Sequence, residues 1–276
     1  MKRNELKDHI AGALYGFAVG DSVGATTEFM SKEEIAAEYG VVKRQMGGGW
    51  LHLNPGDVTD DTQMMLCVMD ALMKFPHDID RFKCECANNF VAWYETGPVD
   101  VGATCAAGIE FYNFTGDYIG PDESKQGNGS LMRYLPCALL CLDEFNVAQG
   151  DVTHPSTVCA SLIQKASKAL RHSMGGRYVT CGVNGPQKPS GYVKDTFNNA
   201  MWYASRGTFN DTLVGAVNDG GDADTIAAIA CSLAGARVGL SGIDPKLIAP
   251  LPLEVKVSFG KFIEFCLNYL FTNRLF

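Results

Sequence analysis

Two short acidic clusters are the residues of this chain best suited to chemistry: Thr59-Asp60-Asp61-Thr62 and Asp222-Ala223-Asp224-Thr225. Each combines carboxylates with neighbouring hydroxyls, which are the hard oxygen ligands typical of Mg²⁺ and Mn²⁺ sites. Each also directly precedes a long apolar segment, which places it where a loop enters a helix. The two clusters brought together would suit a pair of divalent cations. The alternative is that both only cap helices, because Asp and Thr are favoured at helix N-termini.

Two glycine- or proline-containing loops could hold an anion. The first is the run Gly127-Asn128-Gly129-Ser130, whose small residues can present successive backbone N–H groups. The second contains His154, which comes directly before Pro155 and a helical pattern, a position suited to a phosphate group. A plain turn and a capping histidine are the structural alternatives for these two loops.

Two further carboxylates follow similar loops. Glu28 comes seven residues after Asp21, beyond a glycine-rich stretch at residues 16–24, and Asp100 lies in a turn between Pro98 and Gly102. Each adds a carboxylate to a loop of this kind. A solvated glutamate after a helix C-terminus and an ordinary turn aspartate are the alternatives.

Helical periodicity dominates the segments that must position these residues. Apolar residues recur at helical spacing, and β-branched alternation is nearly absent apart from a weak strand candidate at residues 177–181. The pattern predicts one compact all-α domain of many helices over residues 1–276. The expected helices cover residues 6–19, 31–39, 62–74, 79–94, 136–142, 155–170, 193–205, 212–217, 225–238 and 255–270.

Composition restricts the class of protein and its partners. The chain has 276 residues and a net charge of −8, without the basic face that general nucleic-acid binding requires. No uncharged apolar stretch is long enough to span a membrane, and the polar N-terminal residues lack a signal-peptide core. The 10 cysteines form no Cys-x-x-Cys pair, so we expect reduced thiols in a cytoplasmic protein.

The order of the loop motifs resembles the ADP-ribosylglycohydrolase family. The motifs are Gly20-Asp21-x-x-Gly24 with Glu28, Thr59-Asp60-Asp61-Thr62-Gln63, Gly127-Asn128-Gly129, Thr153-His154 and Gly220-Gly221-Asp222-x-Asp224-Thr225. The segment at residues 20–30 is most similar to the dinitrogenase reductase-activating glycohydrolase branch. The resemblance implies an all-α fold with two Mg²⁺ or Mn²⁺ ions at the base of a cleft.

The resemblance also implies roles for individual residues. The implied metal ligands are Thr59, Asp60, Asp61, Asp222, Asp224 and Thr225. The implied catalytic carboxylates are Asp100, Glu28 and Asp61, of which Glu28 lies beside the metals. The implied contacts to ribose and phosphates are Gly127, Asn128, Gly129, Ser130 and His154.

The function implied by the resemblance is hydrolysis of the bond that joins ADP-ribose to a protein side chain, with arginine as the expected acceptor. The partner would be an ADP-ribosylated protein. One alternative is a reader that keeps the ADP-ribose pocket without catalysis, and another is a hydrolase of a serine, nucleic-acid or small-molecule linkage. A different two-metal hydrolase is disfavoured because only 5 histidines are present, none in a close pair. A structural relative would have lost an acidic cluster, and both clusters are intact.

Overall fold

The computed structural model describes residues 2–120, 125–140 and 186–272, and every regular element within these ranges is helical. Two isolated β-bridges, Gly48–Leu53 and Gly127–Tyr192, also occur in this part of the chain. The predicted all-α class is therefore confirmed. The expected helix at residues 155–170 and the strand candidate at residues 177–181 lie outside the described residues.

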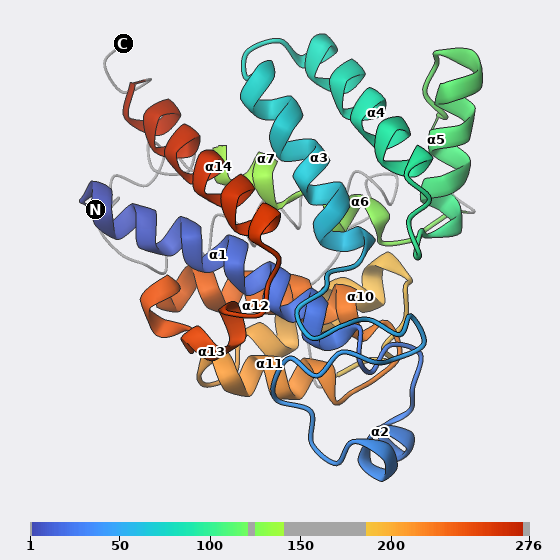
Figure 1. Ribbon diagram of the computed structural model, residues 1–276, viewed down its shortest axis with the longest axis vertical. Coiled ribbons are helices and arrows are strands. Elements are labelled where there is room, and N and C mark those ends of the chain that lie inside the picture. The colour runs from blue at the N-terminus through green and yellow to red at the C-terminus, as the bar shows by residue number, and fades with distance from the viewer. Residues whose placement is uncertain (1, 121–124, 141–185, 273–276) are drawn as a thin grey trace.

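Two antiparallel helices, α1 (Arg3–Gly24) and α12 (Ala223–Val238), form the centre of the molecule (Figure 1). Glycines at four-residue spacing lie on one face of α1, since residues four apart are neighbours on a helix surface. A Cβ atom added at any of them would lie only 2.2 to 2.5 Å from a carbonyl oxygen of α12. The pairs are Gly12 with Gly235, Gly16 with Cys231, Gly20 with Ala227 and Gly24 with Ala223. Only glycine permits the two backbones to approach this closely.

The C-terminal half of α1 corrects the prediction for this region. The expected helix ended at residue 19 and the following glycines were interpreted as part of a loop, whereas the helix continues to Gly24. Glycine disfavours a helix interior by about 1 kcal/mol relative to alanine, which is why the sequence pattern suggested an earlier end. Here the close contact with α12 overrides that preference.

The remaining long helices surround this central pair. Helices α10 (Val193–Ala204) and α11 (Phe209–Val217) pack against α12, and α14 (Leu253–Thr272) packs against α1. A further layer contains α3 (Asp60–Lys74), α4 (Ile79–Glu95) and α5 (Ala103–Thr115), seen at the top of Figure 1. The short elements are α2 (Lys32–Glu38), α6 (Gly129–Met132), α7 (Leu135–Leu140), η1 (Leu240–Gly242) and α13 (Pro245–Ile248). No helix in the described part of the chain is long and apolar enough to cross a membrane.

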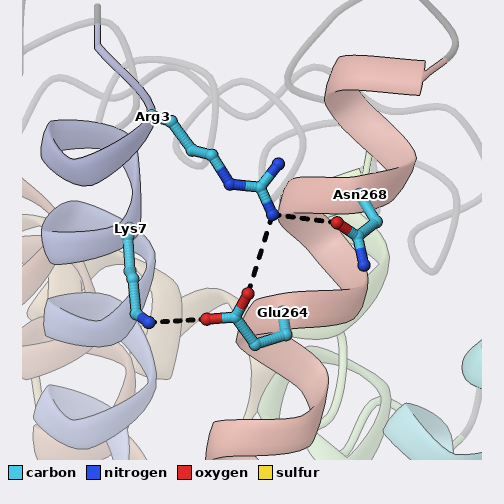
Figure 2. A network of polar contacts seen from close by, with 4 residues as sticks. All are labelled: Arg3, Lys7, Glu264 and Asn268. Atoms are coloured by element: carbon cyan, nitrogen blue, oxygen red, sulfur yellow. Dashed lines mark hydrogen bonds and ion pairs between the residues drawn. The ribbon is translucent and has the colours of Figure 1, made fainter.

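A polar network joins α1 to α14 at the surface (Figure 2). Glu264 pairs with Lys7, and Arg3 donates to the side-chain oxygen of Asn268 over 2.8 Å. The paired Lys7 and Glu264 side chains are about half exposed, and exposed ion pairs contribute only about 0–1 kcal/mol. The packing of α14 on α1 therefore depends mainly on buried apolar contacts, such as the edge-to-face pair of Tyr15 and Phe259.

Local signals set several helix starts as predicted. Ser31 caps α2, and the Glu34 carboxylate accepts a hydrogen bond from the Ser31 backbone N–H, which completes the expected capping box. Helix α5 was not expected. Ile109 is its one buried residue, so the apolar periodicity that reveals a core-facing helix is weak there.

Candidate metal centre

The two acidic clusters meet at the N-termini of α3 and α12. The Thr225 hydroxyl donates to the carboxylate of Asp61 over 3.0 Å. The Thr59 hydroxyl lies 3.5 Å from an oxygen of Asp224. The capping alternative is also partly right, because the Thr59 side chain accepts a hydrogen bond from the N–H of Asp61 at the start of α3. The Thr59 cluster therefore caps a helix and also meets the Asp224 cluster.

Asp21 is the main site residue that the sequence interpretation missed. Its carboxylate is completely buried and accepts hydrogen bonds from the backbone N–H and the hydroxyl of Thr59, at 3.1 and 2.8 Å. It also accepts from the N–H and the hydroxyl of Thr62. The available signal was the position of Asp21 between Gly20 and Gly24. Both glycines pack against α12, so a side chain between them is expected to be buried.

Asp224 belongs to two groups of carboxylates that could each hold a cation. In the first group, oxygens of Asp21, Asp61 and Asp224 all lie within 4.8 Å of one another. In the second, oxygens of Glu28, Asp100 and Asp224 meet the same limit. The predicted ligands Asp60 and Asp222 are adjacent to these groups rather than members of them.

Hydrogen bonds position the two adjacent carboxylates. Asp60 accepts the backbone N–H of Gly102 over 3.3 Å, which connects α3 to the loop that carries Asp100. Asp222 accepts the side-chain amide of Asn128 over 2.6 Å. Loops from two separate parts of the chain are thus held against one carboxylate cluster.

Burial and mutual repulsion make this cluster difficult to ionise without a cation. Burial, together with repulsion from the neighbouring Asp100 carboxylate, raises the pKa of Glu28 to about 8 and that of Asp60 to about 7. Burial likewise raises the pKa of Asp61 and of Asp224 well above the ordinary carboxyl range. Among the described residues, the buried Oδ1 atom of Asp61 has no hydrogen-bond partner. All-oxygen donors with an unpartnered buried carboxylate oxygen fit a hard divalent cation.

Glu28 is held inside the site rather than solvated. Only 5% of its surface is exposed, and the indole N–H of Trp50 donates to its Oε2 atom over 2.7 Å. The alternative of a solvated glutamate is therefore wrong. Trp50 was not predicted as a site residue, because a single tryptophan in a glycine-rich loop gives no indication of the carboxylate that it will contact.

The predicted anion loop at residues 127–130 lies beside the carboxylates. The side-chain amide of Asn128 donates to Thr196 over 3.0 Å as well as to Asp222. Its backbone is fixed by a hydrogen bond from the Asn128 N–H to the Gly191 carbonyl over 3.1 Å. Ser130 is exposed in the short helix α6. A role of this loop in binding phosphates stays a prediction, and His154 lies outside the described residues.

The fold and the site together define the class of protein. The chain belongs to the ADP-ribosylglycohydrolase family, which it matches over residues 2–177 and 156–266. It is 36% identical to the ADP-ribosyl-[dinitrogen reductase] glycohydrolase of Rhodospirillum rubrum, over 91% of this chain and 92% of that protein. It is 29% identical to the ADP-ribosylarginine hydrolase Tri1 of Pseudomonas putida, over 96% of this chain and 78% of that protein.

A solved structure supports the same classification. The structure described as an ADP-ribosylglycohydrolase-related protein complex superposes with a TM-score of 0.73 at 26% sequence identity. The match covers 96% of this chain and 98% of that chain. The family resemblance inferred from the loop motifs is thereby confirmed.

Proposed function

We propose that this enzyme of the ADP-ribosylglycohydrolase type uses two Mg²⁺ or Mn²⁺ ions to remove ADP-ribose from an arginine side chain of a modified protein. The observation that carries the proposal is the convergence of Asp61 from α3 and Asp224 from α12. One buried oxygen of Asp61 has no hydrogen-bond partner in the part of the chain that the structure describes. The names of the two bacterial relatives support a protein-linked, arginine-type substrate.

The residues proposed to hold the cations extend the predicted set by one. The predicted ligands are Thr59, Asp60, Asp61, Asp222, Asp224 and Thr225, with Glu28 beside them. Asp21 joins the set because its oxygens lie within 4.8 Å of those of Asp61 and Asp224. Bound divalent cations would orient sugar hydroxyls and lower the pKa of a nearby water molecule.

The protein's own carboxylates would act on the reacting atoms. Hydrolysis adds water to the C1″ carbon of the ribose and breaks its bond to the guanidinium nitrogen, through an oxocarbenium-like transition state. Asp100 would accept the proton that the attacking water loses, with Glu28 as the second candidate. The Asp100 carboxyl suits this role because it is half-buried and burial raises its pKa, which makes it a better proton acceptor.

The loop at residues 127–130 would hold the ribose and the diphosphate. Because Asn128 contacts Asp222, a ligand held by this loop would lie directly beside the carboxylates. His154 is proposed to contribute to the same binding from outside the described residues. These contacts would anchor the ground state and so affect KM more than kcat.

The test is the release of labelled ADP-ribose from peptides modified on arginine, serine or aspartate, with Mg²⁺, Mn²⁺ or EDTA. We expect release from the arginine-modified peptide, its loss in EDTA, and its recovery when either ion is added back. Asp224→Ala should be folded but inactive, because the apolar face of α12 remains. Full activity in EDTA would contradict the two-metal proposal, and binding without any release would identify a reader instead.

A further inference from the structure

Two exposed aromatic rings, Phe29 and Trp50, lie at the edge of the carboxylate cluster, and we call this pair the aromatic rim. The ring centroids are 5.4 Å apart and the planes are tilted by 43°. Phe29 is 67% exposed and Trp50 is 47% exposed. Large apolar surfaces of this kind are often binding surfaces when they adjoin a polar site.

The backbone holds the aromatic rim in a demanding conformation. Phe29 has a φ angle of +61°, which is uncommon for a residue other than glycine. Its N–H donates to the carbonyl of Gly221 over 2.6 Å, directly before Asp222. An uncommon backbone conformation that points a large apolar ring to solvent is an arrangement found at ligand contacts.

The loop that carries Trp50 is equally well anchored. Hydrogen bonds of 2.8 and 3.1 Å between Gly48 and Leu53 close this loop. Gly49 packs so closely on the C-cap of α1 that an added Cβ atom would lie 2.3 Å from the carbonyl oxygen of Ala25. The hydrogen bond from Trp50 to Glu28 then fixes the indole ring beside the carboxylates. The rim is therefore a preformed surface.

The charge beside the rim indicates the chemistry of its ligand. Seven carboxylates gather here: Asp21, Glu28, Asp60, Asp61, Asp100, Asp222 and Asp224. Carboxyl groups gathered on one side of a binding surface attract a cationic group. A guanidinium group is planar and cationic, and it stacks favourably on aromatic faces.

We propose that the aromatic rim binds the guanidinium end of the arginine-linked substrate and so selects arginine over other acceptors, an inference that rests on the proposed function. We assign the nucleotide end to the loop at residues 127–130, which contacts Asp222, and the acceptor end to the rim, where Trp50 contacts Glu28. The rim therefore distinguishes acceptors, and the loop holds the part that all ADP-ribosyl substrates share.

Phe29→Leu is the informative variant, because it removes the aromatic face while keeping an apolar side chain and the contact of Glu28 with Trp50. Calorimetric titration in the Asp100→Asn background, where turnover is expected to be slower, measures binding of an arginine-ADP-ribosylated peptide, a serine-ADP-ribosylated peptide and free ADP-ribose. We expect the arginine-linked peptide to bind about 2- to 30-fold more weakly to the variant, as for a lost cation–π contact. Binding of the serine-linked peptide and of ADP-ribose should not change.

Phe114→Leu is the matched control, since Phe114 is 92% exposed on α5 and belongs to neither carboxylate group. Equal weakening for all three ligands would overturn the proposal and place the rim at the nucleotide end. Unchanged binding of the arginine-linked peptide would also overturn it. If the wild-type chain releases no ADP-ribose but the arginine-specific loss of binding is found, the hydrolase proposal fails and the rim proposal stands.

Discussion

Substituting Gly20 by alanine tests whether the close packing of α1 on α12 supports the site. The added methyl group would lie 2.2 Å from the carbonyl oxygen of Ala227, while ordinary contacts begin at 3.4 Å. The two helices would have to separate locally by roughly 1 Å, and a gap of that size forfeits a quarter to a half of the dispersion attraction between facing atoms. Overpacking of this kind typically costs about 1–3 kcal/mol.

Gly260→Ala is the matched control for helix propensity. Gly260 lies within α14, is exposed, and has no atom within 4 Å of an added Cβ. Alanine should stabilise this position by about 0.5–1 kcal/mol. The same gain applies to Gly20, so the difference between the two variants isolates the packing cost of about 1–3 kcal/mol.

Calorimetry and urea denaturation of both variants provide the measurement. One kcal/mol shifts the melting temperature of a domain of this size by roughly 2–4 °C, so Gly20→Ala should melt several degrees below Gly260→Ala. Its metal affinity should also fall, because Asp21 is the next residue and Gly24 packs directly against the backbone of Asp224. Equal melting temperatures for the two variants would show that the close approach contributes nothing, and would refute this reasoning.

Three further outcomes are expected. Burial raises the folded-state pKa of Asp60 to about 7 and of Glu28 to about 8. The metal-free protein should therefore be most stable in the pH range where ordinary carboxyl groups titrate, and it should lose stability as the pH rises toward 8. Melting curves across pH with and without Mn²⁺ check this, and a metal-free curve that rises with pH would contradict it. Asp100→Asn should lower kcat by on the order of 10²-fold while ADP-ribose binding is retained, and activity within a few-fold of wild type would transfer the role to Glu28. Thr225→Val removes the hydroxyl that donates to Asp61 and should weaken metal binding in a titration, whereas Thr212→Val, which removes a buried hydroxyl in α11, should not.

The sequence was sufficient to predict the helical class and the acidic clusters because both are local properties. Apolar spacing identified α3, α4, α10 and α14, and carboxylates at helix starts identified the residues around Asp61 and Asp224. Two local arguments failed where tertiary contacts decide the outcome. Glycine suggested an early end to α1, and Asp21 was given no role because its partners, Thr59 and Thr62, are distant in sequence.

The contacts of Glu28 and Asp100 could not be derived from sequence for the same reason. A turn aspartate and a glutamate after a helix gain their significance only when Asp224 is brought beside them. Trp50 is comparable, since its partner Glu28 is 22 residues away and belongs to a different loop. Predicting such contacts would require the packing of α1 on α12, which composition and periodicity do not specify.

The pairing of α1 with α12 also determines when the site can form during synthesis. Asp21 leaves the ribosome about 200 residues before Asp224, an interval of roughly 10–40 s at 5–20 residues per second. Throughout that interval the glycine face of α1 lacks the helix that it fits, and Asp21 and Asp61 lack the third carboxylate of their group. A nascent chain therefore cannot bring these three carboxylates together before Asp224 has been made, so binding of a cation by all three would have to follow the synthesis of the start of α12.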